Sequence, residues 1–348
     1  MADDTVINWN KKFKDFPEIP EPKKWNELGR TQEQILTKKI LDGIVLSISE
    51  ENELEECFDF YGVLIPMLKK LDFRTLENEE IEKFKKYYLY AFNYLVLAAN
   101  DLWVSNLYRL VENKAVSGKN ERLRNQSFLS YPPLDVVSSK RLFNRANTPE
   151  FNVFYATDSI DNALLELKPE PGNLVSVGIW VPMKNNPLKL ISYPISHNPL
   201  AIEVNPEVRK GFIAFQKAKK ENHPLLMRFM EIMFGFISDE FAKPVVNPIS
   251  YYYSAIFAES IFRLSEATYQ YDCILYPSVG NKFKVENLAI KPEIIDKKFK
   301  LERVLEFEIV NTFYQKEPPR KEQNEITVVD YKNLIETDWI EKDGYIVW

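Results

Sequence analysis

RANTPEFNVFYATDSIDNALLE, residues 145–166, is the most informative part of this chain, because it places a strand directly before a short amphipathic helix. The segment 153–156 is rich in β-branched and aromatic residues, which predicts a strand. Asp158 or Ser159 can cap a helix over 159–168. The apolar residues that share one face of that helix, at about 100° per residue, are Ile160, Ala163, Leu164 and Leu167.

Glu166 falls at the edge of this buried face, about 60° from Ala163. A carboxylate in this position can reach a cleft and still meet solvent. Taken alone, Glu166 is more typical of an ordinary residue at the rim of an amphipathic helix. Arg109 and Arg145 are equally ambiguous alone, although a guanidinium suits phosphate recognition because its planar fork makes paired hydrogen bonds.

Beyond this segment the pattern predicts a mixed structure from about residue 105 onward. Further strands are predicted at 174–181, 273–276, 285–290 and 304–310. Further helices are predicted at 206–220, 225–238 and 248–265. The tail, 327–348, mixes apolar and acidic residues and is expected to dock on the body of the protein.

Residues 31–105 are predicted to be all-helical. A capping-box pattern at 31–34, TQEQ, precedes a four-residue repeat of Leu36, Ile40, Ile44 and Ile48. A second helix includes Pro66, a kink or break, and a third begins near Thr75. The most apolar window, 87–104, contains Asn93, Asn100 and Asp101, so it predicts a buried helix and no membrane span.

The predicted class is therefore α+β. An all-helical N-terminal extension covers 1–105, and an α+β domain covers 106–348, with a helical insertion at about 205–265.

Composition excludes several kinds of binding. Only 10 of 348 residues are Gly, and neither a G-x-G-x-x-G nor a P-loop motif occurs. The net charge is −6, from 45 Lys and Arg against 51 Asp and Glu, which argues against non-specific nucleic-acid binding. Two cysteines and two histidines, unclustered, give no zinc site or disulfide framework, so no metal is expected. The start lacks a signal peptide pattern, and a cytoplasmic protein is expected.

A serine hydrolase is disfavoured. Tyr276-Pro-Ser278-Val-Gly280 matches only half of a nucleophile elbow. The base would have to be His197 or His223, each in a predicted loop or turn. Ser278 at a strand end is more typical of a turn or cap residue.

A specific order of short motifs is more informative than any of them alone. In chain order these are Leu107-Tyr-Arg109, Tyr131-Pro-Pro133, Arg145-Ala-Asn147, Val153-Phe-Tyr-Ala156, Ala163-Leu-Leu-Glu166 and Tyr276-Pro-Ser278. Together they resemble the RES-domain family, named for an Arg, a Glu and a Ser, over roughly residues 105–295.

This resemblance implies an ADP-ribosyltransferase-like core, a mixed or antiparallel sheet with flanking helices. Characterised members consume NAD⁺ and release nicotinamide by hydrolysis or phosphorolysis. Many are toxins that deplete cellular NAD⁺ and are restrained by a helix-turn-helix antitoxin. The resemblance thus implies an NAD⁺ glycohydrolase or phosphorylase with NAD⁺ as substrate, no prosthetic group, and an antitoxin partner; a homo-oligomer stays open.

The family's site residues map onto five positions. Arg109 and Arg145 would hold the pyrophosphate, and Tyr155 would stack on a flat ring. Glu166 would stabilise an oxocarbenium-like ribose or orient the attacking water or phosphate. Ser278 would hydrogen-bond the nicotinamide amide or a ribose hydroxyl. The resemblance thus assigns catalysis to Glu166, Arg109 and Ser278, and substrate binding to both arginines, Tyr155 and Ser278.

Two alternatives stay open. One is a non-catalytic nucleotide-binding or interaction protein on the same fold. The other is an ADP-ribosyltransferase that modifies a macromolecule, which would use the same arginines and Glu166 but a different acceptor.

Overall fold

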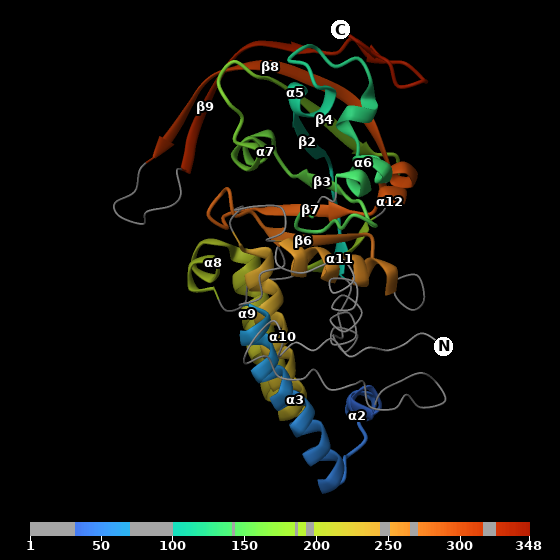
Figure 1. Cartoon of the computed structure of the whole chain (residues 1–348), viewed down its shortest axis with the longest axis vertical. Helices are drawn as coiled ribbons and strands as arrows, with labels where there is room; N and C mark the ends of the chain where they lie inside the picture. The colour runs from blue at the N-terminus through green and yellow to red at the C-terminus, as the bar shows by residue number, and fades with distance from the viewer. Residues whose placement is uncertain are drawn as a thin grey trace. The chain divides into compact units, whose positions relative to one another are not determined.

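The computed structural model describes eight ranges: 32–69, 100–140, 143–184, 187–192, 198–243, 251–264, 271–315 and 325–348 (Figure 1). The chain divides into two compact units. One comprises Met1–Val96 with Lys210–Ser238, and the other Leu97–Arg209 with Asp239–Trp348. All five residues named as candidate site residues lie in the second unit.

The second unit is built on a nine-stranded sheet of order β1-β5-β6-β7-β3-β2-β4-β8-β9. The strands are β1 (Asn100–Leu102), β2 (Leu107–Glu112), β3 (Phe154–Thr157), β4 (Leu174–Pro182), β5 (Leu188–Ser192), β6 (Cys273–Pro277), β7 (Glu286–Ile290), β8 (Phe299–Gln315) and β9 (Glu325–Glu336). Every neighbouring pair is antiparallel except β5 and β6. The long β8–β9 ribbon runs from orange to red in Figure 1. The predicted α+β class is confirmed.

Helices accompany this sheet. Those of the second unit are α5 (Asn113–Ser117), the 3₁₀ turn η2 (Gln126–Leu129), α6 (Leu134–Ser139), α7 (Ile160–Leu167), α8 (Pro199–Val204), α11 (Tyr252–Leu264) and α12 (Pro292–Lys298). The helix α7 starts where predicted, because the Ser159 hydroxyl accepts a hydrogen bond from the Asn162 N–H at 3.2 Å. Its buried face, including Leu164, packs against Val175 and Val177 of β4.

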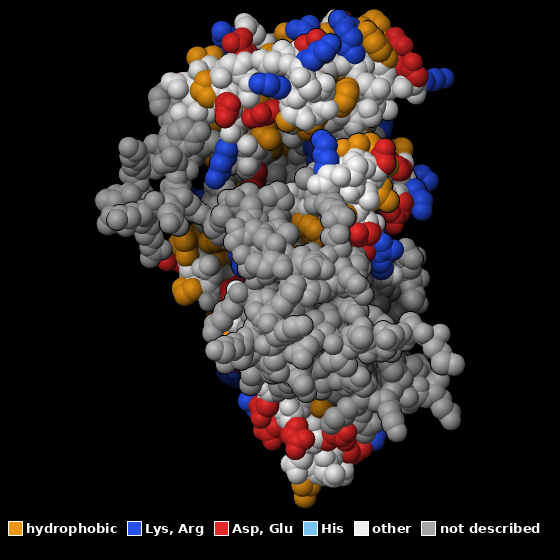
Figure 2. Space-filling view, viewed as in Figure 1, with side chains coloured by type: hydrophobic (Ala, Val, Ile, Leu, Met, Phe, Trp, Pro, Cys, Tyr) orange, Lys and Arg blue, Asp and Glu red, His pale blue; other side chains and the backbone are white. Residues whose placement is uncertain are grey.

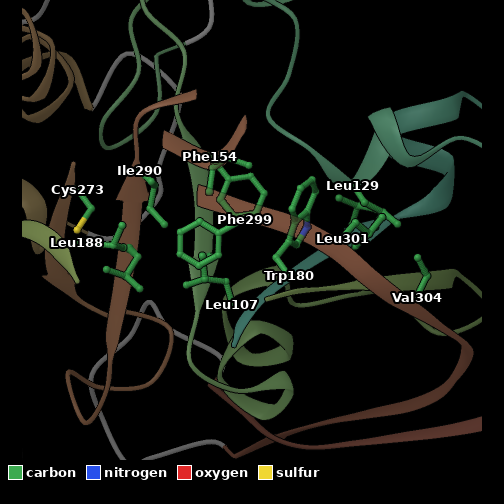
Figure 3. Packing of buried hydrophobic residues seen from close by; sticks show 14 of the residues in the cluster. Leu107, Leu129, Phe154, Trp180, Leu188, Cys273, Ile290, Phe299, Leu301 and Val304 are labelled. Carbon is green, nitrogen blue, oxygen red and sulfur yellow. The ribbon is translucent and has the colours of Figure 1, made fainter. Parts of the chain in front are cut away.

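A hydrophobic core of the second unit lies around β2, β3, β4 and β7 (Figure 3). Phe154 meets Trp180 edge to face, with ring centroids 5.3 Å apart. Leu107 and Ile290 are completely buried in the same cluster. Burial of large side chains on this scale is the main stabilising contribution to such a sheet, at roughly 1.5–3 kcal/mol for each aromatic or branched residue.

The C-terminal tail docks as predicted. The short strands β10 (Trp339–Ile340) and β11 (Ile346–Val347) pair with each other. The indole N–H of Trp348 donates to the Leu123 carbonyl at 2.7 Å, and Ile346 is completely buried.

The first unit is helical in its described part. It contains α2 (Gln32–Leu41), α3 (Ile48–Leu68) and residues 210–238 of α9 (Pro206–Glu221) and α10 (Pro224–Phe241). Phe58 stacks on Phe229 at 4.5 Å, and Arg228 lies 3.6 Å from Glu55. Acidic side chains gather over α3 at the lower end of the view in Figure 2.

Two predictions for the N-terminal part were wrong. The expected helix face from Leu36 to Ile48 is broken, because Gly43 takes a left-handed conformation (φ 74°) and ends α2. Ile44 and Ile48 are consequently 52% and 79% exposed. The all-helical region also ends early, since Asn100–Leu102 forms β1 and pairs with β5. The predicted helix from Thr75 lies outside the described residues.

The other predicted elements agree with the structure within a few residues, except that β8 is much longer than 304–310. The elements that were not predicted are strands β1, β2, β5, β9, β10 and β11 and helices α5, α6, α8 and α12. Within the described ranges, every helix is too short or too polar to cross a lipid bilayer.

Candidate active site

Glu166 of α7 is held by three hydrogen-bond donors, all on the same carboxylate oxygen. Oε1 accepts hydrogen bonds from the Ser278 hydroxyl, the Gly280 N–H at 3.2 Å and the Asn287 side-chain amide at 3.0 Å. Oε2 accepts no hydrogen bond from any described residue. The carboxylate is therefore fixed through one of its two oxygens.

The turn that follows β6 supplies two of these donors. Ser278 is completely buried, and its hydroxyl also accepts a hydrogen bond from the Asn281 N–H at 3.1 Å. A Cβ on Gly280 would lie 2.7 Å from the Leu165 carbonyl and 3.2 Å from the Cδ of Glu166. Glycine is therefore required for this turn to approach α7 so closely.

The third donor comes from the middle of the sheet. Tyr276, Asn287, Thr157 and Tyr108 are directly opposed in register on the adjacent strands β6, β7, β3 and β2. Residues opposed in this way project from the same face of a sheet. Asn287 therefore meets Glu166 on the face that α7 covers.

Tyr155 fixes the turn that carries Arg145. Its hydroxyl accepts a hydrogen bond from the Ala146 N–H at 2.8 Å and donates one to Asn147 Oδ1 at 2.9 Å. Burial raises the pKa of Tyr155 well above its usual range, so the hydroxyl remains a donor. Its predicted stacking on a ligand ring stays a prediction.

Arg145 is buried, and its Nη1 donates to the Phe241 carbonyl. Its guanidinium carbon lies 4.7 Å from the ring centroid of Tyr251. Burial raises the pKa of Tyr251, Arg145 lowers it and Glu166 raises it. Burial likewise raises the pKa of Tyr276, which Arg145 lowers and Glu166 raises. Arg145 and Glu166 therefore both lie close enough to Tyr251 and Tyr276 to shift the pKa values of these tyrosines.

Arg109 lies on β2, next to the strand β3 that carries Tyr155. Strands β2 and β3 pair at a single position, Tyr108 with Thr157, and Arg109 Nη1 donates to the Tyr155 carbonyl at 3.1 Å. Its guanidinium carbon lies 5.4 Å from the Phe154 ring centroid. Burial lowers its pKa to about 10. Within the described ranges, no hydrogen bond or ion pair joins it to Glu166.

Three polar atoms in this region are buried without a hydrogen-bond partner among the described residues. They are Arg109 Nε, Tyr251 OH and Asn287 Oδ1. Such atoms cost roughly 1–3 kcal/mol each when left unpaired, so a ligand that pairs with them would be favoured. Two of these residues, Tyr251 and Asn287, were not predicted from the sequence, and no sequence signal distinguishes them.

The structure brings Glu166 and Ser278 into direct contact, with Arg145 and Tyr155 nearby. The Ser278 hydroxyl donates to Glu166, so its expected contact with a substrate stays a prediction. His223 belongs to the first unit, where its ring lies 3.4 Å from Glu51, and His197 falls outside the described residues. The part of the chain that the structure describes contains no cluster of three or more His, Cys, Asp or Glu side chains suited to a metal.

Comparison of the chain with protein-family models, with curated proteins and with solved structures found no match. The candidate site is therefore defined by its own geometry and by the order of its motifs.

Proposed function

We propose that this chain is an enzyme that consumes NAD⁺ by cleaving the bond between nicotinamide and ribose. The observation that carries the proposal is the Glu166 carboxylate, which is held through Oε1 by three donors and accepts no hydrogen bond at Oε2 from any described residue. Arg145 and unpaired buried donors lie in the same region.

The chemistry requires few groups. As the bond from ribose C1 to nicotinamide breaks, the electron pair leaves with the cationic ring, which becomes neutral, and the ribose becomes oxocarbenium-like. A carboxylate stabilises that positive charge or orients the water or phosphate that attacks C1. Because Glu166 is already fixed, little reorganisation is needed in the transition state. The leaving group needs no proton, so no general acid is required.

The arginines supply the binding interactions in this proposal. The pyrophosphate of NAD⁺ carries two negative charges, and charge-assisted hydrogen bonds to a guanidinium are among the strongest in proteins. Arg145 lies beside Tyr251 and within electrostatic reach of the groups around Glu166. Arg109 is positively charged, and its Nε has no hydrogen-bond partner among the described residues; it would bind the ligand from the side of β2 and β3.

The motif order extends the proposal to a biological role. By resemblance to the RES-domain family, the chain would act as a cytoplasmic toxin that depletes NAD⁺. A helix-turn-helix antitoxin would be its partner.

The test is nicotinamide release from NAD⁺, with and without phosphate, by the wild type and by Glu166→Gln. In this variant the amide oxygen can keep the three hydrogen bonds of Oε1, while an amino group replaces Oε2. We expect at least a hundredfold lower turnover with an unchanged melting temperature.

Unchanged turnover in Glu166→Gln would remove Glu166 from this role. Binding of NAD⁺ by the wild type without release would favour a nucleotide-binding protein. Transfer of label from NAD⁺ to a macromolecule would favour an ADP-ribosyltransferase.

A further inference from the structure

We propose that Tyr251 is a nucleotide-binding residue of this site, and that its hydroxyl donates a hydrogen bond to a phosphate oxygen held beside Arg145. This inference rests on the proposed function and extends it to a residue outside every motif that carries the resemblance. Tyr251 immediately precedes α11, within the predicted insertion at about 205–265.

The first observation is an unpaired buried hydroxyl. Tyr251 is only 4% exposed, yet its OH has no hydrogen-bond partner among the described residues. A buried tyrosine hydroxyl normally finds a partner, because burying it unpaired opposes folding. A ligand oxygen would supply the missing acceptor.

The second observation is the charge around Tyr251. The Arg145 guanidinium carbon lies 4.7 Å from its ring centroid, so a group that accepts from the hydroxyl lies close to a fixed cation. An anionic oxygen satisfies both groups at once. Burial raises the pKa of Tyr251, which keeps the hydroxyl protonated and able to donate near neutral pH.

The third observation is that α11 is anchored to the segment that carries Arg145. Glu259 of α11 accepts hydrogen bonds from the Thr148 hydroxyl and from Arg263 Nε, each at 2.8 Å. The rings of Phe143 and Tyr252 lie 5.3 Å apart. These contacts fix Tyr251 relative to Arg145 before a ligand binds, which lowers the entropic cost of binding.

The test compares Tyr251→Phe with Tyr253→Phe in the full chain, by calorimetric titration with ADP-ribose. Burial raises the pKa of Tyr253, and Glu240 and Tyr252 raise it further, whereas Arg145 and Glu166 do not act on it. We expect Tyr251→Phe to weaken ADP-ribose binding about tenfold, and Tyr253→Phe to leave it unchanged. The melting temperature of ligand-free Tyr251→Phe should be unchanged or higher, since the substitution removes only an unpaired hydroxyl.

Equal ADP-ribose affinity in Tyr251→Phe and the wild type would overturn the assignment, as would a wild type that does not bind ADP-ribose. Nicotinamide release, measured in parallel, reports on the proposed function separately. Release by the wild type with no effect of Tyr251→Phe on binding would overturn the role of Tyr251 alone. Binding that depends on Tyr251, without release, would support this role and overturn the enzymatic proposal.

Discussion

The Ser278 hydroxyl donates a hydrogen bond to Glu166 across 112 positions of sequence, and so joins the end of β6 to α7. Ser278 is completely buried and also accepts from the Asn281 N–H. The hydroxyl therefore donates one hydrogen bond and accepts one within the protein. The geometry therefore makes Ser278 a residue that orients the carboxylate.

Ser278→Ala should lower kcat for nicotinamide release much more than it changes KM. Loss of this donor lets the carboxylate rotate, and a displacement near 1 Å can cost roughly 100-fold in rate. Stability should fall by about 1 kcal/mol, the usual net value of one hydrogen bond. Steady-state kinetics and thermal unfolding check both expectations. Ser260→Ala is the control, since this buried serine bonds the Phe257 carbonyl within α11. A rise in KM alone would show that Ser278 contacts the substrate.

Gly280→Ala should impair both folding and activity. The added methyl group would lie 2.7 Å from the Leu165 carbonyl, so the turn must move away from α7. This movement would break the hydrogen bond from the residue 280 N–H to Glu166. Overpacking of this kind costs about 1–3 kcal/mol.

The control for this substitution is Gly62→Ala in α3. An added Cβ there meets nothing within 4 Å, so stability should rise by roughly 0.5–1 kcal/mol. Denaturant unfolding and nicotinamide release test both variants. Full activity in Gly280→Ala would contradict the requirement for a close turn.

Arg109 should bind anions up to high pH at a cost in stability. Its pKa falls from 12.5 to about 10 on folding, chiefly through burial, so the folded protein releases this proton more easily than the unfolded chain. The penalty is complete below pH 10 and is relieved as the pH rises from 10 to 12.5. Affinity for ADP-ribose should therefore stay constant from about pH 7 to 9 and fall above about pH 10.

Arg109→Met should remove the ADP-ribose-dependent rise in melting temperature without lowering the melting temperature of the free protein. Exposed Arg303→Met, which loses only a surface ion pair with Glu336, should behave as the wild type. Retained ligand stabilisation in Arg109→Met would exclude Arg109 from binding.

The α2–α3 pair should weaken in acid. Glu50 accepts hydrogen bonds from Lys39 Nζ and from Ser47, and these contacts lower its pKa from 4.5 to about 2. Its stabilising contribution is therefore complete above pH 4.5 and is lost as the pH falls toward 2. Helicity by circular dichroism, followed over this range, should fall less in Glu50→Gln. If Glu50→Gln lost helicity in acid to the same extent as the wild type, protonation of Glu50 would not be the cause of the loss.

Local pattern was sufficient to predict the elements that carry Glu166. The Ser159 cap and the apolar face with Ala163 and Leu164 are encoded within ten residues, and α7 follows them. The break after α2 was also encoded locally, by Asp42-Gly43 and by Ser47 with Glu50, but the four-residue apolar repeat masked it.

The rest of the site depends on tertiary placement. Asn287 becomes a partner of Glu166 only because β7 lies beside β6 in the sheet. Tyr251 becomes significant only because α11 is anchored near Arg145. Neither relationship leaves a periodic signal in the sequence, since each joins residues far apart in the chain.

The buried atoms without partners have a consequence for protein engineering. A library of variants selected only for heat resistance would be enriched in apolar replacements at Arg109 and Tyr251, because each removes a buried polar atom that has no hydrogen-bond partner among the described residues. The most heat-resistant variants from such a selection would have lost the side chains that we assign to nucleotide binding. The variants from that selection can be sequenced beside variants selected for nicotinamide release. Positions at which the first set loses polar residues and the second set keeps them would identify the residues that bind the nucleotide.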